Sequence, residues 1–202
     1  RAALAWMPKR YLRVNTLKCT REELQAILAK EHVTTIPVDG VETALQVTSD
    51  AALFRTKAFA DGCFEQQDAG SQLVAAALEV TPGMRVIDAC AGAGGKTLHI
   101  AAMMEGKGRL LAMDVEEWKL ENLKQRARRA GAHNVETRVI TSSKTVKRLK
   151  ESADRVLLDV PCSGLGVLKR NPDAKWRDTA ERLPVLVALQ EEILQRYSQM
   201  VK

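Results

Sequence analysis

Short apolar runs alternate with amphipathic stretches along the second half of the chain. The apolar runs predict strands over residues 84–87, 109–113, 135–140 and 155–160. The stretches between them predict helices over residues 96–104, 119–130 and 143–150, and the second of these carries one apolar face. Repeated strand–helix alternation predicts an α/β fold, with a parallel sheet covered on both sides and ligands bound at the carboxyl ends of its strands.

The first sixty residues have a different pattern. It predicts strands over residues 11–17, 36–38 and 44–47 and a helix over residues 20–30. Thr20 followed by Glu23 forms a capping box at the start of that helix. We therefore divide the chain into a small α+β module, residues 1–60, and a larger α/β domain, residues 61–202, which opens with a helix over residues 70–78.

Composition narrows the class of partner. The 202 residues are 46% hydrophobic, which is enough to bury a core, and their formal net charge is +6. Clustered lysines and arginines favour a polyanionic partner, although solvated helix faces explain about half of them.

No apolar run is long enough to cross a bilayer and no signal peptide is evident, so we expect a cytoplasmic protein that contacts no membrane. The four cysteines lack metal-ligand spacing, and we expect no metal.

A glycine-rich loop follows the first strand of the α/β domain. The sequence Asp88-Ala-Cys-Ala-Gly-Ala-Gly-Gly-Lys-Thr97 contains Gly92, Gly94 and Gly95, which let the main chain approach a ligand closely. The helix that begins near Lys96 presents unpaired amides to the same place. A nucleotide-sized binding site at this loop is therefore expected.

An acidic residue at the end of the next strand strengthens this interpretation. Asp114 follows the glycines by about twenty residues, where nucleoside-binding folds place a carboxylate on ribose hydroxyls. Its alternative role is a helix cap before Glu116. A phosphate-loop triphosphatase is disfavoured, because that motif needs glycine where Cys90 stands and because Asp88 would repel phosphates. The two positive charges of S-adenosyl-L-methionine suit this acid–glycine–acid pattern better than ATP or NAD.

A second loop, Asp159-Val-Pro-Cys-Ser-Gly164, places a thiol after another strand. A thiolate that adds to C6 of cytosine makes C5 nucleophilic enough to accept a methyl group, so Cys162 suggests covalent catalysis. Its alternative role is that of a small buried hydrophobe.

With both loops, the chain resembles the NOL1/NOP2/Sun family of RNA cytosine-C5 methyltransferases, in particular the bacterial Sun (Fmu) branch that acts on 16S rRNA. The segments that carry the resemblance are Arg13–Lys18, Gly62–Gln72, Asp88–Thr97, Ala112–Asp114, Asp159–Gly164 and Arg170–Trp176. Together they run through nearly the whole chain in the family's order.

The resemblance implies a Rossmann-like S-adenosyl-L-methionine-dependent methyltransferase domain with a small RNA-recognition-like module, acting on RNA, with ribosomal RNA as the expected substrate. It implies that Asp88, Cys90, Ala91, Gly92, Ala93, Gly94, Gly95 and Lys96 hold the donor's amino-acid part. Asp114 would hold its ribose, and Asp159 would lie where donor and base meet. In this family the Pro-Cys thiol, here Cys162, assists product release, and a cysteine in a later Thr-Cys-Ser motif bonds to C6.

Three departures from the family pattern bear on function. Gly92-Ala93 replaces the usual Ala-Pro, and residues 140–143 lack the acid that commonly helps to bind adenine. The chain ends at Lys202, in an amphipathic helix from about Pro184, before the Thr-Cys-Ser strand. We therefore expect an N-terminal fragment with an open sheet edge and an uncovered helix face.

RNA contacts are expected at basic residues, three of which, Lys169, Arg170 and Lys175, flank the thiol loop. We nominate Arg13, Lys169, Arg170 and Lys175, and Trp176 as a stacking or core residue. The functional hypotheses are an RNA cytosine methyltransferase whose nucleophile lies outside this chain, an inactive module that binds RNA or the donor, and a triphosphatase dependent on Lys96.

Overall fold

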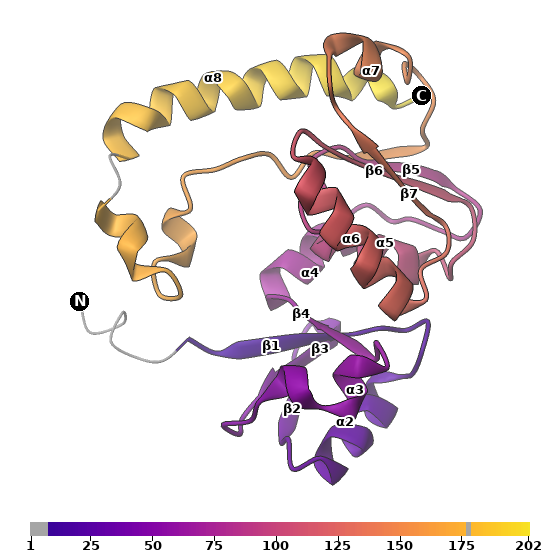
Figure 1. Cartoon of the computed structure of the whole chain (residues 1–202), viewed down its shortest axis with the longest axis vertical. Coiled ribbons are helices and arrows are strands. Elements are labelled where there is room, and N and C mark those ends of the chain that lie inside the picture. Colours follow the sequence, from indigo (N-terminus) through magenta and orange to yellow (C-terminus); the bar gives the residue numbers. More distant parts are fainter. Residues whose placement is uncertain (1–7, 177–178) are drawn as a thin grey trace.

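A computed structural model describes residues 8–176 and 179–202, and in that part the chain forms two four-stranded sheets (Figure 1). The first sheet is antiparallel, in the order β2-β3-β1-β4. Its strands are β1 (Arg10–Val14), β2 (Thr35–Val38), β3 (Val41–Val47) and β4 (Phe64–Gln66). Helix α2 (Arg21–Lys30) packs on it through Leu24 and Leu28, and the predicted Thr20–Glu23 capping box is present.

Two features of this sheet differ from the prediction. Strand β1 ends at Val14 instead of residue 17, because Asn15 begins a turn in which its side-chain oxygen accepts from the Leu17 amide. Strand β4, which was not predicted, pairs with β1 although it lies beyond residue 60. The division of the chain at residue 60 stays a prediction.

The second sheet is parallel, in the order β7-β6-β5-β8, as the alternating pattern predicted. Its strands are β5 (Arg85–Asp88), β6 (Arg109–Asp114), β7 (Val135–Val139) and β8 (Arg155–Leu157). The helices of this half are α4 (Ala69–Ala76), α5 (Gly95–Met103), α6 (Glu117–Ala130), α7 (Ser143–Lys147) and α8 (Thr179–Tyr197). Strand β8 is three residues shorter than expected and lies at the sheet edge.

Both faces of the parallel sheet are covered. Successive side chains of a strand point to opposite sides, so each strand contributes to the core on both faces. Val86 and Leu110 pack in one cluster with α4, α5 and α6. Ile87 and Met113 pack in the other with α7, α8 and the segment after α8. Figure 1 shows α4, α5 and α6 on one side of this sheet and α7 and α8 on the other.

Helix α8 begins at Thr179, five residues before the predicted start at Pro184. Ile193 and Tyr197 are buried against the sheet, so this end of the predicted apolar face is covered. Leu189, which belongs to the same predicted face, is 39% exposed. Within the described ranges, no helix combines the length and apolar character required to cross a bilayer.

The two sheets meet at helix α6. Asn15 donates from Nδ2 to the Gly62 and Ala130 carbonyls, both at 2.8 Å. A Cβ at Gly62 would lie 2.1 Å from the Arg129 carbonyl oxygen, so only glycine allows this approach. These contacts fix the first sheet against the carboxyl end of helix α6.

Candidate functional site

The glycine loop lies at the carboxyl edge of the parallel sheet, between β5 and α5. A cavity of about 600 Å³ opens beside it, within the range of small-molecule sites. Its lining includes Cys90, Gly92, Asp114, Asp159 and Pro161 together with residues 140–143. A pocket of about 110 Å³ shares Cys90 and Asp159 with this cavity and adds Asp88, Ala91, Gly95 and Lys96. The structure thus brings the two predicted loops and the predicted acid together.

The loop needs glycine at particular places. Gly92 and Gly94 have φ values of 53° and 86°, in the left-handed region that other residues rarely adopt. A Cβ at Gly94 would also lie 2.1 Å from Leu123 Cδ1 of helix α6. The first intrahelical hydrogen bond of α5 runs from the Leu98 amide to the Gly94 carbonyl, so the amides of residues 95–97 have no acceptor within the helix.

Asp114 ends β6 and is 8% exposed. Its Oδ2 accepts from the Gly92 amide at 2.8 Å, and its Oδ1 accepts from the Glu116 amide at 2.9 Å. The carboxylate therefore fixes the glycine loop and also caps the turn before α6. Each carboxylate oxygen keeps acceptor capacity toward the cavity.

Asp88 is fully buried at the base of the small pocket. Thr97 donates from Oγ1 to its Oδ2 at 2.7 Å, and among the described residues no partner reaches Oδ1. Burial raises the pKa of Asp88 to about 6, a shift that the Thr97 hydrogen bond opposes. At the pocket mouth, Lys96 Nζ donates to Asp159 Oδ2 at 2.5 Å.

The two cysteines near the cavity differ in character. Burial raises the pKa of Cys90 to about 12, so this residue is a thiol at neutral pH and not a nucleophile. Cys162 is exposed. It follows β8, which pairs with β5, so both loops leave the same sheet edge. Pro161 lines the cavity, but Cys162 is not part of its wall.

Sequence reasoning missed several residues of the cavity wall. Glu116 and Lys119 line it, and Trp118 between them donates from Nε1 to Glu116 Oε2 at 3.1 Å. Glu192 and Tyr197 of α8 also line it. Only the apolar spacing of α8 gave a signal, and we interpreted that spacing as an uncovered helix face instead of a ligand wall.

The nominated RNA contacts lie in different surroundings. Arg13 is 1% exposed, and its guanidinium donates to Gln67 and to the Gly95 carbonyl, which contradicts its assignment as an RNA contact. Arg170 is exposed and forms a bidentate ion pair with Asp68. Lys169 is exposed and lines a hollow of about 260 Å³ with Arg170. Trp176 is 79% exposed, and the side chain of Lys175 lies outside the described residues.

Comparison with known proteins identifies the family. A family model described as 16S rRNA methyltransferase RsmB/F matches residues 75–202. The chain belongs to this family. The match confirms the predicted family and cofactor class, since these are S-adenosyl-L-methionine-dependent methyltransferases.

Two curated relatives of this RsmB/F chain are named probable ribosomal RNA small subunit methyltransferase B. The Synechocystis protein is 38% identical over 197 residues and the Bacillus subtilis protein is 35% identical over 196 residues. Each alignment covers 96% of this chain and 44% of the relative. The chain therefore spans less than half the length of these relatives.

Solved structures confirm the predicted Rossmann-like fold. The crystal structure of PH0851 has a TM-score of 0.93 and 30% identity, covering 100% of this chain and 46% of that chain. A methyltransferase homologue from Pyrococcus horikoshii has a TM-score of 0.85 and 29% identity, covering 100% and 63%. NSun6 from Pyrococcus horikoshii with SFG shares the fold, with a TM-score of 0.87 and 22% identity, covering 96% and 73%.

Proposed function

We propose that this chain is the donor-binding part of a cytoplasmic enzyme that methylates C5 of cytosine in ribosomal RNA, with S-adenosyl-L-methionine as methyl donor. The observation that carries the proposal is the cavity of about 600 Å³ beside the glycine loop and Asp114, which shares Cys90 and Asp159 with the small pocket above Asp88. A nucleoside fits the larger space and a charged amino-acid group fits the smaller one. The family match to 16S rRNA methyltransferases supports RNA as the substrate.

The residues present fit this donor. Asp114 offers a carboxylate to ribose hydroxyls, and the buried Asp88 has an oxygen without a partner among the described residues. Because its pKa is about 6, Asp88 is mostly ionised at neutral pH and favours a cationic group in the small pocket. The bound donor supplies a methyl group on a positively charged sulfur. The task of the loop is to hold that group at a fixed distance from the RNA.

Cytosine needs activation, because its C5 is a poor nucleophile. In the proposed reaction a cysteine thiolate other than Cys162 adds to C6, and C5 then takes the methyl group. A base next removes the C5 proton, and the electrons of that C–H bond re-form the C5–C6 double bond and expel the thiolate from C6. We assign Cys162 to this last step, on the family resemblance. Its exposed position beside the cavity wall suits a thiol that faces RNA instead of the donor. Asp159, on the cavity wall, is assigned to the meeting point of donor and base.

Donor binding is tested by isothermal titration calorimetry with S-adenosyl-L-homocysteine. Asp114→Asn keeps the side-chain shape but loses the charge, and we expect Kd to rise about 10- to 100-fold, as for a lost hydrogen bond to a charged group. Asp39→Asn, at an exposed position, is the matched control and should bind like the wild type. Absence of binding heat in the wild type, or equal Kd values for the two variants, would refute the proposal.

Base specificity needs a transfer assay. Unmodified 16S rRNA and labelled S-adenosyl-L-methionine are incubated with the chain, with the full-length Bacillus subtilis relative as a parallel reaction. Digestion to nucleosides and mass spectrometry identify the methylated atom. 5-Methylcytidine is the expected product of the full-length enzyme, and a methyl group on any other atom contradicts the C5 assignment.

A binding-only role for these residues is the second candidate. It is favoured by the absence of a carboxylate at positions 140–143 of the cavity wall, where the family resemblance leads us to expect an acid that helps to bind adenine. RNA binding by the chain with no calorimetric response to the donor would favour this role over the first.

A further inference from the structure

Two arginines hold the outer side of the glycine loop. Arg126 of α6 donates from Nη1 to the Ala93 carbonyl at 2.6 Å, and Arg13 of β1 donates from Nη1 to the Gly95 carbonyl. The two arginines are far apart in the sequence, but their targets are separated by a single residue. The loop is thus fixed from behind by one residue of the first sheet and one of helix α6.

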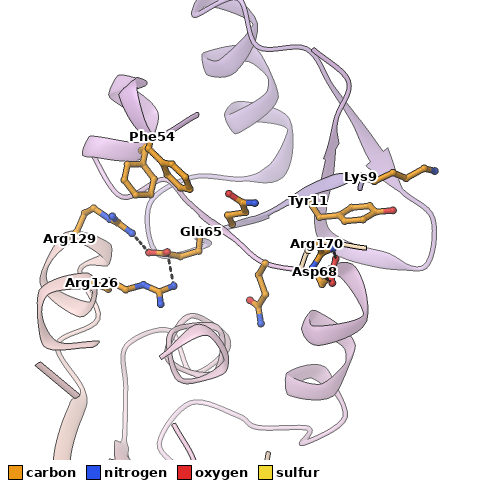
Figure 2. A pocket seen from close by; sticks show the side chains of 11 residues that line it. Lys9, Tyr11, Phe54, Glu65, Asp68, Arg126, Arg129 and Arg170 are labelled. Atoms are coloured by element: carbon orange, nitrogen blue, oxygen red, sulfur yellow. Dashed lines mark hydrogen bonds and ion pairs between the residues drawn. The ribbon is translucent and has the colours of Figure 1, made fainter. Parts of the chain in front are cut away.

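Both arginines are anchored on the segment around β4. Glu65, which is 4% exposed, accepts from Arg126 Nη2 at 2.9 Å and from Arg129 Nη2. Figure 2 shows this carboxylate between the two guanidinium groups that α6 presents. Arg13 donates to Gln67 Oε1 at 2.6 Å, and Gln67 is itself 8% exposed. The first sheet therefore orients both of the groups that reach the loop.

The burial of Arg13 needs an explanation. The residue is 1% exposed, its Nε has no partner among the described residues, and burial lowers its pKa to about 10. A buried ion is often no more stabilising than a well-packed apolar residue of similar volume. Packing alone therefore does not explain a buried cation at this position. A hydrogen bond that fixes the loop does explain it.

The contacts constrain the peptide groups of the loop. In a trans peptide the carbonyl and the amide of the next residue point in opposite directions. Holding the Gly95 carbonyl therefore fixes the Lys96 amide, which lies in the first turn of α5 beside the small pocket. Leu123, one turn before Arg126, packs on Gly94 and closes the same side. Arg13 and Arg126 themselves line neither pocket at the loop, whereas Gln67, the partner of Arg13, lines the small one.

From this geometry we infer that Arg126, held by Glu65, is a positioning residue for the donor loop, and that Arg13 supports the loop in the same way. The inference rests on the proposed function, since the loop is taken to bind the donor. It adds a link from the first sheet to the donor site: a change at Glu65 alters donor affinity although Glu65 lies outside both pockets at the loop.

The test compares Arg126→Lys with Arg129→Lys. Both positions lie on α6 and pair with Glu65, but only Arg126 also binds a loop carbonyl. Lysine keeps the charge and loses the planar fork that spans two acceptors. In calorimetry with S-adenosyl-L-homocysteine, we expect Kd to rise about tenfold in Arg126→Lys and less than twofold in Arg129→Lys. Glu65→Gln should raise Kd by about threefold, since it removes the ionic anchor and keeps the shape.

Hydrogen exchange of the ligand-free chain gives a readout that does not depend on donor binding. Faster exchange across residues 93–98 in Arg126→Lys, with Arg129→Lys like the wild type, supports the inference even if the wild type binds no donor and the proposed function fails. Equal loop exchange in both variants, or equal Kd values, overturns it. Thermal unfolding identifies a general loss of stability, which would speed exchange in both halves of the chain and not selectively across residues 93–98.

Discussion

A graded set of alanine substitutions in the glycine loop tests whether its backbone and its packing are both required. Gly94 combines a φ of 86° with a Cβ position 2.1 Å from Leu123 Cδ1. Gly92 has a φ of 53° but open space where its Cβ would lie. Gly95 has neither a positive φ nor a nearby atom. The three positions therefore separate backbone strain from crowding within four residues.

The magnitudes follow from these two contributions. A left-handed conformation costs a residue with a Cβ about 1–2 kcal/mol, and an extra methyl in a packed site costs about 1–3 kcal/mol. Gly94→Ala should thus lower the free energy of unfolding by about 2–5 kcal/mol, and Gly92→Ala should lower it by about 1–2 kcal/mol. Gly95→Ala should be neutral or gain up to about 1 kcal/mol, because alanine favours the helix.

Thermal unfolding followed by circular dichroism measures the series. For a chain of this length a loss of 1 kcal/mol lowers Tm by about 2–4 °C, so a 3 kcal/mol loss at Gly94 corresponds to about 10 °C. We expect Tm to be highest for Gly95→Ala, lower for Gly92→Ala and lowest for Gly94→Ala. If Gly94→Ala were as stable as Gly95→Ala, the described loop geometry would be wrong.

Three further results are expected. Asp88→Asn should remove a pH dependence of stability, because the folded-state pKa of Asp88, about 6, exceeds the ordinary value of 3.8. As pH rises from about 4 to about 6, the free energy of unfolding of the wild type should fall by about 3 kcal/mol relative to the variant, as measured by urea unfolding. His99→Gln should show the opposite sign, because burial lowers the His99 pKa to about 3 and wild-type stability is lost as pH falls below about 6.5; an identical pH profile for wild type and variant would contradict this. Lys169→Ala should lower the salt slope of RNA binding by about one, and an unchanged slope would remove Lys169 from the RNA contacts.

The parallel sheet and its carboxyl-edge site were predictable, because their signals are local. Strand–helix periodicity predicted β5 to β8, and the glycines with Asp114 marked the place where a ligand approaches the backbone. Strand β4 was missed because its three residues, Phe-Glu-Gln, include one apolar side chain, whereas the equally short β8 lies in a longer apolar run. Its place in the sheet is set by pairing with β1, far earlier in the sequence.

The environments of single charged and reactive side chains could not be predicted in the same way. Arginine is usually exposed, so Arg13 was assigned to RNA, whereas its partners lie 54 and 82 residues away and bury it. Cys162 follows a predicted strand, yet an irregular loop decides which way its thiol faces. Such placements depend on tertiary contacts between distant residues, which periodicity does not encode.

The intrinsic fluorescence of Trp118 offers a way to follow ligand binding in the large cavity. This side chain is 61% exposed, bonds to Glu116 and lies 5.7 Å from the ammonium of Lys119, and both neighbours line the large cavity. A molecule entering between them changes the charge and hydration around the fluorophore, and hence its emission. Ligand occupancy of the large cavity can then be followed by tryptophan emission without an added label, with the Trp118→Phe variant as the comparison.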